Sequence, residues 1–160
     1  MANYSAIKAA VNAYIKANGK NEIIIANAGG RAVRFDETQV RPMGRTATGV
    51  QSIVLDDDPR DGVVGMCIIN DAETESIMVL SENGFGKRTD VEEYRKTSRH
   101  AKGVKTLAIT EKTGYLVAIT VVKDEDDLMI INKSGITIRT SVDQIPVQGR
   151  ATQGVRIINL

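Results

Sequence analysis

The chain has 160 residues, of which 42% are hydrophobic, so it is long enough and apolar enough to form a globular domain with a core. Aromatic residues make up only 4% and Trp is absent, which argues against an aromatic platform for single-stranded nucleic acid. The net charge of +1 hides a segregation, because the windows 31–45, 84–105 and 133–156 hold 15 of the 21 basic residues and only 6 of the 20 acidic ones.

The first residues show no targeting or membrane signal. Residues 1–10 lack the basic region and apolar run of a signal peptide, and we leave them unassigned. No stretch approaches the roughly 18 apolar residues of a membrane span. Residues 6–15 fit an amphipathic helix by periodicity, but their place before the first repeat predicts a strand over Val11–Ala17, which we favour.

Three segments of the chain superimpose without internal gaps. They span 22–55, 76–109 and 127–160, and equivalent positions are 54 and then 51 residues apart. In each segment an apolar run is followed by polar residues and a glycine, which indicates a hairpin turn. These glycines are Gly30, Gly84 and Gly135.

Beyond the turn, each repeat carries the same further residues. An arginine follows the glycine by four positions, a second arginine comes eleven later, and a Gly-Val pair four after that. The first arginines are Arg34, Arg88 and Arg139, the second are Arg45, Arg99 and Arg150, and the last glycines are Gly49, Gly103 and Gly154. A pattern repeated three times at fixed spacing indicates one structural unit.

Further extended runs lie between the repeats, at Val63–Ile69 and Tyr115–Val122. With them each unit has about four short strands, which is typical of a propeller blade. We therefore predict an all-β fold of about three four-stranded blades in a partial ring, covering residues 11–160. Cys67, the only cysteine, lies in one of these runs and is interpreted as a small core residue. The acidic segments 56–58 and 124–127 are expected in solvated loops, with a calcium site as the alternative.

The segments Gly44–Val50 (GRTATGV) and Gly149–Val155 (GRATQGV) resemble the blade signature of the C-terminal domain of gyrase A subunits. The resemblance extends to Gly30–Arg34, Gly135–Arg139 and the ending 154–160. It implies a β-pinwheel, a propeller-like ring of usually six blades whose basic rim is wrapped by duplex DNA. With three repeats the chain resembles about half of such a ring, so we expect an open arc or pairing with another copy. The corresponding subunit of topoisomerase IV has the same blades in degenerate form and is the nearest alternative.

The family's hallmark, the box Q-R-R-G-G-K-G, has its nearest match at 97–103, where Arg99, Lys102 and Gly103 agree and four positions depart. This departure leaves open whether the chain wraps DNA unaided. Tyr94 aligns with Val40 and Ile145 and is expected to be a packing residue rather than the strand-cleaving tyrosine.

Rows of Arg and Lys on a curved surface would neutralise phosphates with few base contacts. Arg34, Arg88 and Arg139 could instead pair with blade carboxylates, whereas the loops of Arg45, Arg99 and Arg150 should lie on one outer edge. Glycines 49, 103 and 154 could let backbone amides approach a phosphate. The candidate DNA-binding residues are Arg45, Lys87, Arg88, Arg95, Lys96, Arg99, His100, Lys102, Lys105, Arg150 and Arg156.

No catalytic triad, metal-ligand spacing or phosphate-binding loop occurs, so no catalytic residue, metal site or cofactor is assigned to this chain. The resemblance implies a cytoplasmic, ATP-dependent type IIA topoisomerase that introduces negative supercoils and uses ATP and Mg²⁺ outside this domain. The implied partners are double-stranded DNA, the rest of gyrase A and gyrase B, with no membrane. A protein-binding propeller of the kelch or WD type and a purely structural scaffold remain as alternatives.

Overall fold

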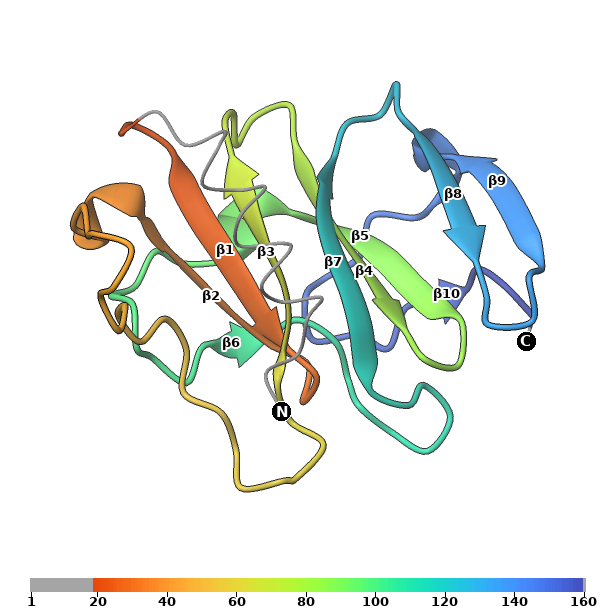
Figure 1. The fold of residues 1–160 in the computed structure, drawn as a ribbon. Helices are drawn as coiled ribbons and strands as arrows, with labels where there is room; N and C mark the ends of the chain where they lie inside the picture. The colour runs from red at the N-terminus through yellow and green to blue at the C-terminus, as the bar shows by residue number, and fades with distance from the viewer. Residues whose placement is uncertain (1–18, 160) are drawn as a thin grey trace.

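The computed structural model describes residues 19–159, so the strand expected over Val11–Ala17 lies outside the described residues. Three β-hairpins follow one another along an arc (Figure 1). They consist of β1 (Glu22–Asn27) with β2 (Arg31–Asp36), β4 (Ser76–Ser81) with β5 (Phe85–Asp90), and β8 (Asp127–Ile131) with β9 (Thr137–Ser141).

The hairpin turns contain the three glycines that the repeat predicts. Gly30, Gly84 and Gly135 have φ of +77°, +78° and +85°, a region that residues with a Cβ avoid. In each turn the glycine N–H donates to the carbonyl three residues earlier, at 3.0–3.1 Å. The predicted hairpins are therefore present in all three repeats.

Two of the hairpins are parts of four-stranded sheets. The first sheet has the order β3-β1-β2-β6 and the second β7-β4-β5-β10, whereas β8 and β9 pair only with each other among the described residues. The added strands are β3 (Val63–Ile69), β6 (Val104–Lys105), β7 (Leu116–Val122) and β10 (Val155–Arg156). The all-β, propeller-type fold is confirmed, and β3 and β7 coincide closely with the runs expected between the repeats.

The fourth strand of each complete sheet comes from the following repeat. β6 belongs to the second repeat but pairs with β2 of the first, and β10 belongs to the third repeat but pairs with β5 of the second. The sequence repeat and the sheet are thus out of phase, a feature that the repeat pattern did not reveal.

A short 3₁₀ turn follows the second strand of every hairpin. These turns are η1 (Glu37–Gln39), η2 (Val91–Glu93) and η3 (Val142–Gln144). Val91 and Val142 are fully buried, so the turns anchor the chain where it leaves the hairpin. Among residues 19–159, no helix is long and apolar enough to cross a bilayer.

The core lies between consecutive sheets. Ile24 and Ala26 of β1 belong to the same buried cluster as Ile77 and Val79 of β4, and Tyr94 lies in it without solvent exposure. Tyr94 is therefore a packing residue, as expected. A second cluster joins the second sheet to the third hairpin, and its members are Met78, Val122, Val142 and Ile145. Runs that are apolar on both faces are explained by this stacking.

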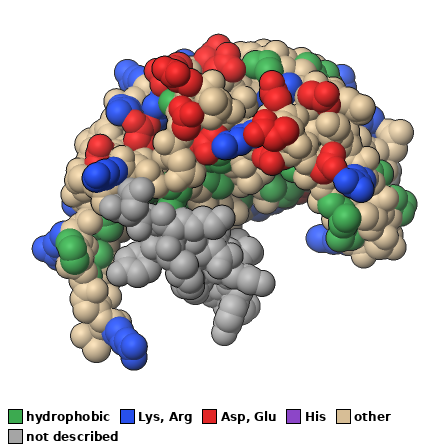
Figure 2. Space-filling model, turned by 90° about the horizontal axis from the view of Figure 1, so that it is seen from above, with side chains coloured by type: hydrophobic (Ala, Val, Ile, Leu, Met, Phe, Trp, Pro, Cys, Tyr) green, Lys and Arg blue, Asp and Glu red, His purple; other side chains and the backbone are tan. Residues whose placement is uncertain are grey.

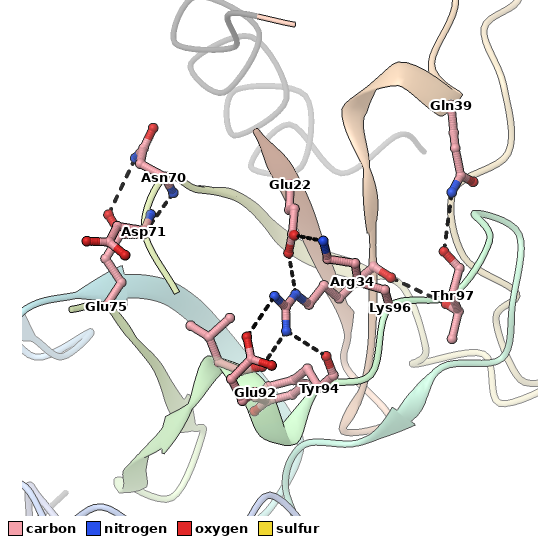
Figure 3. A network of polar contacts seen from close by, with 11 residues as sticks. Glu22, Arg34, Gln39, Asn70, Asp71, Glu75, Glu92, Tyr94, Lys96 and Thr97 are labelled. Carbon is pink, nitrogen blue, oxygen red and sulfur yellow. Dashed lines mark hydrogen bonds and ion pairs between the residues drawn. The ribbon is translucent and has the colours of Figure 1, made fainter. Parts of the chain in front are cut away.

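A buried arginine links the first sheet to the turn of the next repeat (Figure 3). The Arg34 guanidinium donates to the carbonyls of Val91 and Tyr94 at 2.9 and 3.0 Å and forms ion pairs with Glu22 and Glu92. The carbonyls belong to η2 and its C-terminal cap, so one side chain connects two repeats. Its side chain is only 4% exposed.

The same link recurs one repeat later. Arg88 donates from Nε to the Ile145 carbonyl at 2.7 Å and pairs with Asp124, and its side chain is 7% exposed. The expectation that these arginines pair with blade carboxylates holds for both. The carbonyl contacts show that their further task is to connect neighbouring repeats.

Replacing Arg34 by Ala should lower the free energy of unfolding by about 3 kcal/mol, because it leaves two carbonyls without their donor and takes one of two cationic partners from the largely buried Glu22 carboxylate. The matched control is Arg139→Ala, whose side chain is 72% exposed. In dilute solution, Arg139→Ala should lower the free energy of unfolding by less than about 0.5 kcal/mol. Urea denaturation of both variants checks this, and equal losses would contradict it.

Glu22 should make the protein sensitive to acid. Burial alone would raise the pKa of its carboxyl, but hydrogen bonds from Lys96 and Arg34 outweigh burial and hold the pKa below its ordinary value of 4.5. The stabilisation is present above pH 4.5 and is lost as the pH falls through the lowered pKa. Glu22→Gln should therefore flatten the fall of unfolding free energy below pH 4.5 in urea titrations. An unchanged slope would show that Glu22 does not contribute.

Candidate nucleic-acid interface

The outer edge of each complete sheet is the short strand donated by the next repeat. Val104 and Lys105 pair with Ala32 and Arg31, and Val155 and Arg156 pair with Gly86 and Phe85. The basic loops that precede these strands are thereby fixed to the outside of the arc.

The glycine before each donated strand makes this pairing possible. Gly103 has φ +74° and Gly154 has φ +76°. A Cβ at either position would lie within 3.0 Å of the carbonyl oxygen of Ala32 or Gly86. We expected these glycines to let a phosphate approach the backbone, but at Gly103 and Gly154 a neighbouring strand occupies the space beside the glycine instead.

Successive basic loops are joined along this outer edge. Arg99 Nη1 donates to the Gln51 carbonyl at 3.1 Å, and Arg150 Nη1 donates to the Lys105 carbonyl at 3.3 Å. Gln51 and Lys105 are equivalent positions, so the contact is repeated from loop to loop. The loops of Arg45, Arg99 and Arg150 therefore follow one another on one edge, as expected. We call this edge the basic rim, formed by residues 44–51, 95–105 and 149–156.

Most of the predicted side chains on the basic rim face solvent and form no ion pair with an acidic side chain. Apart from Lys96, none of the exposed Lys or Arg residues among them forms an ion pair within residues 19–159. The other exposed candidates are Arg45, Arg95, His100, Lys102, Lys105 and Arg156. His100 has an unusual φ of +61°, and the Arg156 guanidinium lies 4.7 Å from the centre of the Phe85 ring.

Three further candidate DNA-binding residues use part of their side chain for contacts within the protein. Lys96 is 58% exposed but pairs with Glu22, so its charge also supports the Arg34 network. Arg99 and Arg150 are half-buried and use part of their guanidinium groups to join the loops. Their remaining N–H groups leave both able to take a phosphate oxygen.

Lys87 and Arg88 lie in the interior, which removes them from the candidate interface. Lys87 is fully buried, and its ammonium donates to the carbonyls of Gly149, Arg150 and Thr152 at 2.6–3.0 Å. Burial lowers the pKa of Lys87 to about 8, which leaves the amine protonated at neutral pH. Its task is to hold the loop that carries Arg150. Arg88 is occupied by the contacts with Ile145 and Asp124.

Acidic side chains gather on one face of the arc, which Figure 2 shows from above. A hollow there is lined by Glu73, Glu75, Asp90, Glu92, Asp124 and Glu125, and we call this surface the acidic face. Within residues 19–159 no group of three or more His, Cys, Asp or Glu side chains is placed to hold a metal ion. No Lys or Arg lines this hollow, although basic side chains lie among the acidic ones elsewhere on the same face (Figure 2). The hollow itself therefore repels a polyanion.

Arg31 lies beside the basic rim but was not among the predicted residues. It lies opposite Lys105 in the β2–β6 pair, and its guanidinium is 3.4 Å from the Gly103 carbonyl and 3.8 Å from Asp56. Its neighbour across the sheet comes from the next repeat, 74 positions later by number. Because β6 of the second repeat pairs with β2 of the first, Arg31 lies next to Lys105, and only the structure shows this.

Comparison with known proteins agrees with this geometry. The family model described as "DNA gyrase C-terminal domain, beta-propeller" matches residues 21–70, 75–123 and 126–160. The chain belongs to this family. Its matched segments each begin close to one of the three hairpins.

Curated DNA gyrase A proteins are also similar to this chain in sequence. The DNA gyrase A protein of Staphylococcus aureus strain MRSA252 is 45% identical over 143 residues, which cover 89% of this chain and 16% of the relative. The same values hold for the protein from strain NCTC 8325. The chain thus spans about a sixth of the length of these curated relatives.

Solved structures share the fold. The C-terminal domain of a DNA topoisomerase IV has a TM-score of 0.81 at 25% identity, covering 88% of this chain and 43% of the other. A DNA gyrase A C-terminal domain has a TM-score of 0.55 at 19% identity, covering 89% and 63%. The E. coli ParC C-terminal domain has a TM-score of 0.69 at 16% identity, covering 87% and 56%.

The donated strand can be tested through its glycine. Gly103→Ala should lower the free energy of unfolding by more than about 2 kcal/mol, because it adds a clash with the Ala32 carbonyl to the cost of a positive φ. Gly49 has φ +90° with nothing within 4 Å of an added Cβ. Gly49→Ala should therefore lower the free energy of unfolding by only about 1 kcal/mol, the cost of a positive φ in a residue with a Cβ. Thermal and urea denaturation measure both, and equal effects would rule out the packing role of Gly103.

Proposed function

We propose that this chain binds duplex DNA along the basic rim, without sequence selectivity, and bends it around the arc. The observation that carries the proposal is the set of exposed cations on the donated strands and the loops before them, none of which lines the acidic hollow. A curved array of this kind matches a ligand whose charges are regularly spaced along a bendable rod.

The chemistry of the rim favours backbone binding over base readout. Lys and Arg side chains that neutralise phosphates release condensed counterions, a contribution that does not depend on sequence. The guanidinium fork can also take two phosphate oxygens at once. The rim consists of two-residue strands and short loops, and no described helix stands out from it to enter a major groove. We therefore assign wrapping rather than sequence recognition to it.

The loop 97–103, which partly matches the gyrase box, supplies the centre of the proposed surface. Arg99 joins this loop to the preceding one, while His100 and Lys102 are exposed beside it. The left-handed backbone of His100 turns the chain at this point. We assign Arg99 to positioning with partial phosphate contact, and Lys102 to direct phosphate contact.

Within the whole enzyme, the domain's task is to shape DNA while other parts perform the reaction. We propose that the chain acts as the C-terminal domain of gyrase A in a cytoplasmic, ATP-dependent type IIA topoisomerase. There it would present a bent DNA segment to the cleavage machinery, with the rest of gyrase A and gyrase B as partners and with ATP and Mg²⁺ bound elsewhere. The 45% identity to gyrase A relatives supports gyrase over topoisomerase IV.

A salt titration of duplex binding tests the proposal. If about six phosphates are neutralised, log affinity against log salt should have a slope near −5. Lys102→Ala combined with Lys105→Ala should make the slope shallower by about two, since each lost contact removes roughly one ion. Fluorescence anisotropy with a labelled duplex of random sequence gives the slopes.

Lys123→Ala is the matched control, because Lys123 lies beside the acidic face and its main-chain N–H bonds to Asp126. This variant should leave the slope unchanged. A flat salt dependence of the parent chain would reject DNA wrapping, and an equal effect of Lys123→Ala would reject the rim as the binding surface.

A further inference from the structure

A pair of like charges lies at the outer edge of the first sheet. Arg31 of β2 and Lys105 of β6 are directly opposite each other in the antiparallel pair, so both side chains stand on the same face. Lys105 is exposed and forms no ion pair within residues 19–159. Like charges in this arrangement weaken the strand pairing, and an anion placed between them relieves the repulsion.

The second sheet has a different pair at the equivalent place. Phe85 stands where Arg31 does in the first sheet, and Arg156 lies opposite it with its guanidinium 4.7 Å from the centre of the ring. A cation on an aromatic face is an attractive contact that needs no further partner. The need for an anion is therefore a property of the junction between the first and second repeats.

The third repeat brings another cation to the same strand. The Arg150 guanidinium donates to the main-chain carbonyl of Lys105 at 3.3 Å. Its loop is held in place, because the Lys87 ammonium donates to the Arg150 carbonyl at 2.6 Å and the Glu93 carboxylate accepts the Arg150 main-chain N–H at 3.1 Å. Arg31, Lys105 and Arg150 thus come from three successive repeats and meet around β6.

Asp56 is the carboxylate that pairs with this cluster, and the pair is loose. Its Oδ2 lies 3.8 Å from Arg31 Nε, which is longer than a hydrogen bond, and its side chain is 45% exposed. The Arg31 guanidinium also donates to the Gly103 carbonyl at a long 3.4 Å. Exposed ion pairs of this kind contribute little to stability, so a phosphate can replace the Asp56 carboxylate at low cost.

The main chain nevertheless keeps Asp56 beside Arg31. The Asp61 carboxylate accepts hydrogen bonds from the Asn27 side chain and from the main-chain N–H groups of Gly29 and Asp56, each at 2.8 Å. The fully buried Asn27 in turn accepts the main-chain N–H of Arg31 at 2.8 Å. This network joins the loop of Asp56 to the hairpin turn before Arg31. The carboxylate is therefore a fixed neighbour with a weakly held side chain.

We propose that Asp56 is a counter-ion that duplex DNA displaces, and that a backbone phosphate takes its place between Arg31 and Lys105. The inference rests on the proposed DNA binding and adds to it a further phosphate contact, Arg31, and a residue that opposes binding. Arg150 lies at the adjoining edge, where it meets the same phosphate or the next one along the strand. Asp56 competes with DNA for these cations and so lowers the affinity of the rim at this junction.

Removal of the carboxylate tests the competition. Asp56→Asn keeps the main-chain N–H that bonds to Asp61 and should strengthen binding of a labelled random-sequence duplex about two- to fivefold at about 0.1 M salt. Asp57→Asn is the matched control, because Asp57 lies in the same loop and forms no ion pair within residues 19–159. Its effect should be clearly smaller. Equal gains for both variants, or no gain for Asp56→Asn, would overturn the proposal.

A double-mutant cycle tests whether Asp56 acts through Arg31. Arg31→Gln should make the salt slope of duplex binding shallower by about one, whereas Arg31→Lys keeps the charge and should retain the slope of the parent chain. In the Arg31→Gln background, Asp56→Asn should lose most of its gain in affinity, because the cation for which it competes is gone. An undiminished gain in that background would show that Asp56 does not act through Arg31 and would overturn the proposal.

The same titrations separate this inference from the proposed function. A parent chain without salt-dependent duplex binding would reject the basic rim and this inference together. A steep parent slope that falls with Lys102→Ala and Lys105→Ala but stays unchanged with Arg31→Gln would keep the rim and overturn the displacement at Arg31. Urea denaturation of each variant shows that it is folded at the temperature of the binding measurement, so that the affinities compare native proteins.

Discussion

The structure depends on a hydrogen-bonded exchange between repeats, in which the second and third repeats each donate a two-residue strand to the sheet before them. Strand edges expose unpaired amides and carbonyls, and a hairpin alone has two such edges. The donated strand covers the outer edge, β3 or β7 covers the inner one, and a buried arginine fixes the junction. The same exchange determines the proposed function, because the donated segments carry the cations of the rim. Stability and binding surface are thus produced by one element.

The sequence was sufficient to predict the fold class and the order of the hairpins along the chain. Gly30, Gly84 and Gly135 mark turns that only residues tolerant of positive φ can form, and the apolar runs identify strands buried between sheets. What the sequence did not show is the sheet to which Val104 and Val155 belong. A two-residue strand has no periodicity of its own, and its partner is chosen by tertiary contacts in the adjacent repeat.

Site prediction placed the cations of loops and short edge strands at the surface correctly and those of the central strand β5 wrongly, for a physical reason. Lys102, Lys105 and Arg156 lie at or near the free outer edge and face solvent. Lys87 and Arg88 occupy a central strand, where alternation directs one residue to each face and both faces are covered. A basic window in the sequence therefore contains cations that bind carbonyls inside the molecule as well as cations available to a polyanion. Charge density alone does not separate them, whereas position within the repeat does.

The phase shift between repeat and sheet has a consequence for how such domains change in evolution. A duplicated segment of about 50 residues brings with it a new strand for the preceding sheet and a new acceptor edge for the following one. Both sides of every junction are therefore copied together, and a ring can gain or lose one unit without any new surface having to arise. A unit cut at the boundary of a sheet instead would separate each strand from its partner. The recombination points that preserve folding thus lie inside the sheets rather than between them.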